Sequence, residues 1–152
     1  MRMNQDLIKA LEEKGVYVYD LEFKQRRIKY ENEPHMIAVR YSGGKPRSIV
    51  LIEVKSKRKA CKDETSGLTH HLEGMNNYIS AFKSLKLQNS PETIPNLESI
   101  KEFEMMVILI NTAVDYYNER KDIIHEYIKE KKYKCEIMEW TDAKTLNQLF
   151  KN

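Results

Sequence analysis

Cysteine, glycine and proline are scarce in this chain of 152 residues, which contains 2 Cys, 5 Gly and 4 Pro. Two cysteines cannot build a disulfide framework, and Cys61 and Cys135 lack the paired spacing of a zinc site. The low Gly and Pro content, together with 41% hydrophobic residues, excludes a disordered composition. We therefore expect a single ordered domain over residues 1–152 in a reducing compartment, with the cytoplasm as the expected location.

Long apolar runs are also missing. The longest, Met105 to Ile110, is far too short to span a bilayer, and the first fifteen residues alternate acids and bases instead of forming an apolar signal segment. We expect neither secretion nor membrane insertion. A net charge of +3 does not by itself identify a nucleic-acid binder, so the local distribution of charge matters more.

Basic residues cluster in one part of the chain. Residues 45–62 include seven Lys or Arg and one acid, Glu53. A solvated surface loop explains such a run, but its position directly after an apolar strand favours contacts with phosphate groups. The predicted nucleic-acid contacts are Lys57, Arg58 and Lys59.

Hydrophobic periodicity predicts an alternation of helices and strands. The order favours an α/β sandwich with a central mixed sheet of about five strands, an antiparallel meander followed by a parallel right-handed crossover, flanked by helices. The expected elements are a helix over 3–14, strands over 16–28, 36–41 and 48–54, a helix of about five turns from Leu68 through Phe82, a strand over 105–110, a helix over 115–132, a strand over 134–140 and a helix over 141–150.

The strand over 48–54 carries the charged residues of greatest interest. It is apolar from Ile49 to Val54 except at Glu53, so we expect it to be central and covered on both faces. Glu53 and Lys55 are two residues apart and therefore share one face of the strand. A carboxylate and an ammonium near a sheet interior are costly unless they pair with one another or meet a ligand.

The glycine-rich segment before this strand predicts which residues lie across from the charged pair. Ser42 to Pro46 contains the residue types that accept a tight reversal. A turn near Gly44 places His35 opposite Glu53 and Glu33 near Lys55. The predicted site is therefore a convergence of two carboxylates, an imidazole and an amine.

The chain resembles the PD-(D/E)XK nuclease superfamily over roughly residues 1–140, in the order of elements, the Gly43-Gly44-Lys45-Pro46 turn, the segment Leu51-Ile52-Glu53-Val54-Lys55-Ser56 and the Tyr78-bearing helix that follows. The family's acid-x-Lys motif maps onto Glu53, Val54 and Lys55. The resemblance implies Mg²⁺ or Mn²⁺ bound by Glu53 and the Val54 carbonyl, with Lys55 as the base that positions water. It also implies a restriction-endonuclease-like fold and an endonuclease or exonuclease that cuts DNA in preference to RNA.

One departure from the family affects the metal ligands. Pro34-His35 stands where the family has Pro-Asp, so Glu33 or Asp20 would have to supply the missing acid, and Glu33 ranks first. His35 as a ligand would shift the preference toward Mn²⁺ or another transition ion.

Several further residues rank lower as site candidates. Asp6 could supply an extra acid from the first helix, while the spacing of Tyr78 favours a place in the core. Gly74 stands where one subfamily has a Gln on this helix. For His70 and His71 at the helix start, we expect exposure to solvent.

Two other functional classes stay open. One is a nuclease-like domain without catalytic activity that binds nucleic acid or a protein partner, as His35 in place of the acid suggests. The other is a structural domain, with a homodimer left open, in which Glu53 and Lys55 neutralise one another.

Overall fold

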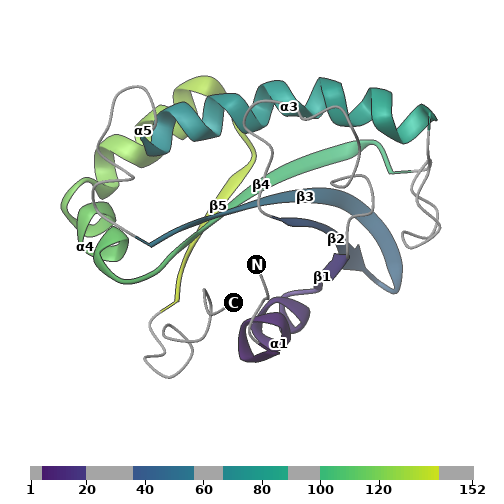
Figure 1. Ribbon diagram of the computed structural model, residues 1–152, viewed down its shortest axis with the longest axis horizontal. Coiled ribbons are helices and arrows are strands. Elements are labelled where there is room, and N and C mark those ends of the chain that lie inside the picture. The colour runs from purple at the N-terminus through teal and green to yellow at the C-terminus, as the bar shows by residue number, and fades with distance from the viewer. Residues whose placement is uncertain (1–4, 20–35, 57–66, 89–99, 141–152) are drawn as a thin grey trace.

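Among the residues described by the computed structural model, 5–19, 36–56, 67–88 and 100–140, five strands form one mixed sheet with helices on both faces (Figure 1). The strands lie side by side in chain order. This confirms the predicted α/β class. The elements are α1 (Gln5–Glu13), β1 (Val16–Tyr19), β2 (Met36–Ser42), β3 (Lys45–Lys55), α3 (Leu68–Gln88), β4 (Glu102–Leu109), α4 (Thr112–Glu119), α5 (Lys121–Lys131) and β5 (Cys135–Glu139).

The first three strands form the predicted antiparallel meander. Gly43 and Gly44 turn the chain between β2 and β3 with φ angles of 58° and 77°, which is why glycine suits both positions of this two-residue turn. Met36 lies opposite Ile52, the register that the turn predicts. The prediction of a strand as far as residue 28 reaches beyond the described residues after Tyr19.

The last three strands are parallel, as expected for strand, helix, strand units. The prediction of one helix over 115–132 is wrong, because the chain forms α4 and α5 with a break at Arg120 (φ −127°, ψ 22°). No glycine or proline marks this break, and both helices bury residues on the same side of the sheet. The predicted helix over 141–150 lies outside the described residues.

Two apolar layers cover the sheet. Alternate residues of β3 face opposite sides, with Ile49 and Leu51 beneath α3 and with Val50 and Ile52 toward α1. All four are fully buried, so β3 is the central strand that its sequence predicts. Within the described ranges, no helix has the length and apolar composition needed to cross a membrane.

Candidate functional site

Glu53 and Lys55 lie at the carboxyl end of β3, on the face covered by α3. They continue the row of Ile49 and Leu51, and their relative exposures are only 6% and 7%. On the neighbouring strand β4 they lie opposite two apolar residues, Val107 and Leu109. The central strand therefore ends in two charged side chains held in mostly apolar surroundings, a costly arrangement that calls for a ligand or a partner.

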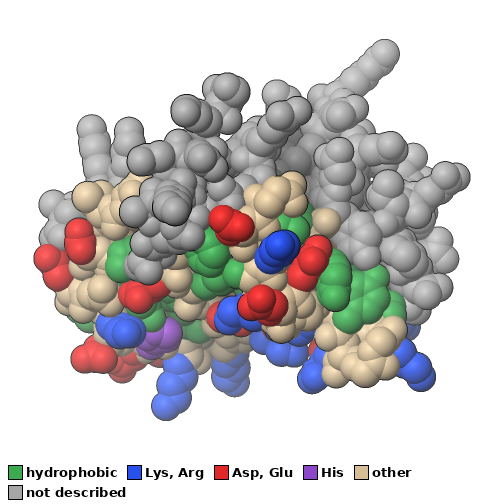
Figure 2. All heavy atoms as spheres, turned by 90° about the horizontal axis from the view of Figure 1, so that it is seen from below, with side chains coloured by type: hydrophobic (Ala, Val, Ile, Leu, Met, Phe, Trp, Pro, Cys, Tyr) green, Lys and Arg blue, Asp and Glu red, His purple; other side chains and the backbone are tan. Residues whose placement is uncertain are grey.

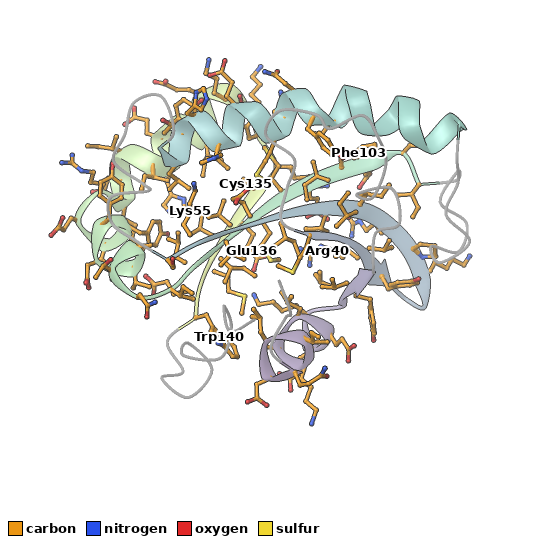
Figure 3. The ribbon with its side chains drawn as sticks, in the orientation of Figure 1. Arg40, Lys55, Phe103, Cys135, Glu136 and Trp140 are labelled. Atoms are coloured by element: carbon orange, nitrogen blue, oxygen red, sulfur yellow. The ribbon has the colours of Figure 1, made fainter. Side chains whose placement is uncertain are left out.

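His71 approaches the end of this row from α3. Its Nε2 atom lies 3.4 Å from Lys55 Nζ (Figure 3 labels Lys55). A lysine ammonium has only donors, so a hydrogen bond in this contact requires Nε2 to accept. Lys55 therefore meets an imidazole nitrogen from the covering helix.

The expectation that both histidines of the helix start are exposed is correct for His70 and wrong for His71, which is half-buried. The reason is helical geometry: Leu68, His71, Leu72 and Met75 follow the spacing of one helix face, and the three apolar members are buried. That spacing is visible in the sequence and could have identified His71 as a residue facing the sheet.

The carboxyl ends of the three parallel strands meet at one edge of the sheet. The Ile110 N–H donates to Lys55 O over 3.0 Å, and the Trp140 N–H donates to Leu109 O over 2.9 Å, so the strand ends are linked in sequence order. In open α/β sheets, ligands bind preferentially outside this edge. Glu53 and Lys55 thus lie at this edge of the sheet, although the described strands follow one another in chain order without the reversal of strand order that usually marks the binding position.

The other predicted site residues are placed as follows. Val54 is buried and its side chain packs in the layer on the α1 side. Tyr78 is 3% exposed and belongs to the core beneath α3, as its spacing predicts. Asp6 is exposed in the first turn of α1, which covers the opposite face of the sheet from Glu53. Outside the described residues lie Glu33, His35, Asp20, Lys57, Arg58 and Lys59.

Oxygen donors at Glu53 suit the hard cations Mg²⁺ and Mn²⁺. Within the described part of the chain, no group of three or more His, Cys, Asp or Glu residues could hold a metal ion. The additional ligands proposed from the sequence, Glu33 and His35, belong to the remaining part. The metal site therefore stays a prediction.

A second polar cluster, which the sequence did not reveal, lies on the α1 side of the sheet (Figure 3). Arg40 Nε donates to Glu104 Oε2 over 2.9 Å, and Ser48 Oγ donates to the same oxygen. Arg40 Nη2 lies 3.5 Å from Glu136 Oε1, and Lys14 Nζ lies 2.7 Å from Glu136 Oε2. The four charged groups are paired with one another, so this cluster links four strands to the end of α1. These paired groups offer no open position for a metal ion.

A third polar contact connects α4 to α5 across their break. Tyr117 Oη lies 2.6 Å from His125 Nε2, a partner that no sequence pattern indicates. Burial, with smaller electrostatic effects of Glu139 and Cys135, raises the pKa of Tyr117. Burial, with a smaller effect of the Glu136 carboxylate, raises the pKa of the Cys135 thiol to about 12. Both groups therefore stay protonated at neutral pH and serve the packing of this layer.

Comparison of the chain with family models, with curated proteins and with solved structures gave no significant match. The class that the fold defines is an α/β domain with a five-stranded mixed sheet in the described residues. The function is therefore inferred from Glu53 and Lys55 at the end of β3.

Proposed function

We propose that this protein is a metal-dependent nuclease of the PD-(D/E)XK type, which hydrolyses phosphodiester bonds in DNA in preference to RNA. The observation that carries the proposal is the burial of both Glu53 and Lys55 on one face of the central strand, at the carboxyl edge of the sheet. Charged groups in such a position are costly unless they pair with other groups or meet a ligand, and ionisable groups in such surroundings are frequent at functional sites. The acid-x-Lys spacing supplies the chemistry that a phosphodiester requires.

Glu53 would hold the cation through its carboxylate, together with the Val54 carbonyl. When bound, a divalent cation neutralises phosphate charge and favours ionisation of water. Lys55 would orient the attacking water with Nζ. The water oxygen would form a bond to phosphorus while the bond to the leaving oxygen breaks. The water proton would pass to solvent and the leaving oxygen would take a proton from solvent, while Lys55 would stabilise the negative charge that develops on the phosphate. His71 would act as a positioning residue, because its Nε2 fixes the direction of Lys55 Nζ.

The test is cleavage of supercoiled plasmid, linear duplex and single-stranded DNA with Mg²⁺ or Mn²⁺. We expect metal-dependent cleavage by the unaltered protein and a loss of at least a hundredfold in Lys55→Ala, in line with the contribution of general acid-base groups. Lys129→Ala, which alters an exposed lysine of α5, is the matched control and should cleave normally.

Two results would overturn the proposal. One is the absence of cleavage with every substrate and either metal, and the other is a Lys55→Ala protein as active as the unaltered one. Salt-sensitive DNA binding without cleavage would instead assign the protein to the class of non-catalytic nucleic-acid-binding domains.

A further inference from the structure

A groove lies at the hairpin end of the sheet, away from Lys55. Its volume is about 460 Å³, within the range of sites that bind small molecules. Among the described residues, Gly15, Tyr17, Tyr41 and Gly44 line it, which gives this part of its surface two aromatic rings and two glycines. The proposed nuclease chemistry uses none of these residues.

The two tyrosines form a fixed aromatic corner. Their ring centroids are 5.3 Å apart and the ring planes meet at 87°. Tyr41 is half-buried and packs against the core beneath α3, whereas Tyr17 has 41% of its surface exposed. An edge-on pair of this kind leaves a face of the exposed ring open for a planar ligand.

The glycines keep side-chain atoms out of the groove. Gly15 has φ 81°, and a Cβ atom added there would lie 3.0 Å from the Tyr41 carbonyl oxygen. The Tyr41 N–H donates to Gly15 O over 2.8 Å, which fixes this close approach. Gly44 has φ 77° and would meet no atom within 4 Å, so its side of the groove is open.

One basic residue adjoins the groove through its place in the turn. Lys45 directly follows Gly44, and its side chain is exposed. Arg47, further along the same strand, is also exposed and lies 3.8 Å from the Glu102 carboxylate. Figure 2 shows hydrophobic side chains exposed toward this end of the molecule with Lys and Arg side chains beside them. An aromatic surface next to cations complements a stacked base flanked by phosphates, and it suits an uncharged peptide less well.

We propose that this groove binds an unpaired base of a nucleic-acid strand by stacking on Tyr17, so that the substrate class is DNA with a single-stranded segment. That the bound strand is a substrate rests on the proposed nuclease function. Tyr41 lies opposite Pro46 on β3, and Lys55 is nine residues further along that strand. At a rise of about 3.3 Å per residue, the base would be held roughly 30 Å along the strand from the cleavage site, several nucleotides away.

The experiment measures binding of fluorescein-labelled oligothymidylate by fluorescence anisotropy, in EDTA so that no strand is cut. We expect Tyr17→Ala to weaken binding about 5- to 100-fold, because stacking on an aromatic side chain has this effect per base. Tyr17→Phe should bind within about twofold of the unaltered protein, since stacking does not need the hydroxyl. Ile123→Ala is the matched control, because Ile123 is exposed on α5 and lies outside the groove.

An abasic strand of the same length separates stacking from attraction by charge. It should bind more weakly than oligothymidylate, and Tyr17→Ala should not weaken it further. The inference is overturned if the unaltered protein does not bind oligothymidylate, or if Tyr17→Ala binds it as tightly as the unaltered protein. The same binding measurement in Lys55→Ala keeps the two proposals distinct. Base-dependent binding together with no cleavage at all would reject the nuclease and retain the groove. Normal cleavage together with unchanged binding in Tyr17→Ala would reject the groove alone.

Discussion

Replacing the two buried charges at the end of β3 should make the protein more stable and inactive. Glu53 and Lys55 are each more than nine-tenths buried, so solvent screens them little, and their β4 neighbours Val107 and Leu109 offer apolar contacts to new side chains. The double variant Glu53→Met/Lys55→Met has similar side-chain volumes without charges. Replacement of buried charges in this way is neutral or stabilising by about 1–4 kcal/mol.

Thermal unfolding followed by circular dichroism measures the effect. At about 2–4 °C per kcal/mol for a chain of this size, a gain of about 1–4 kcal/mol corresponds to a rise in Tm of roughly 2–16 °C. Lys129→Met, at an exposed position, should change the free energy of unfolding by less than about 0.5 kcal/mol. A lower Tm in the double variant would contradict this expectation, because it would mean that the two charged groups stabilise the fold more than apolar side chains of similar volume do.

Three further predictions follow from other contacts. In steady-state cleavage assays, His71→Ala should lower kcat at least tenfold with little change in KM. His71→Gln should restore part of the lost kcat, because its side chain supplies an acceptor to Lys55. His70→Ala should leave both constants unchanged. Arg40→Met should lower the free energy of unfolding by about 2–4 kcal/mol in urea titrations, because it leaves the poorly exposed Glu104 carboxylate without its cation. With a pKa of about 12, Cys135 contributes stability below pH about 9 that is lost as the pH rises toward 12, since the unfolded thiol ionises first. In a Cys61→Ser protein at pH 9, iodoacetamide should therefore alkylate the folded chain at least tenfold more slowly than the unfolded chain, and equal rates would contradict this assignment.

Local signals in the sequence predict the meander and its register. Gly43 and Gly44 accept the positive φ angles of the turn, and the turn together with a one-residue shift between Arg40 and Tyr41 sets which residues of β2 and β3 lie opposite one another. The apolar run around Glu53 likewise predicts a central strand. Since Glu53 and Lys55 differ by two positions, their shared face follows from strand geometry without any tertiary information.

Other features depend on contacts that no local pattern encodes. The break at Arg120 has no glycine or proline to mark it, because α4 and α5 both pack on one face and the hydrophobic period continues. Pairing of Arg40 with Glu104 requires the alignment of β3 with β4, which no turn fixes. His71 differs from these features, because its spacing from Leu68 in the sequence indicates a position facing the sheet. Its place at the start of the helix favours the opposite expectation, that the side chain is exposed.

Isothermal titration calorimetry with Mn²⁺ can show whether the Glu53 carboxylate is a metal ligand at the end of β3. We expect saturable binding by the unaltered protein, at least tenfold weaker binding by Glu53→Gln and near-normal binding by Lys55→Ala, whose side chain acts on water. Binding that is undetectable, or equally tight in Glu53→Gln and the unaltered protein, would contradict this role of Glu53.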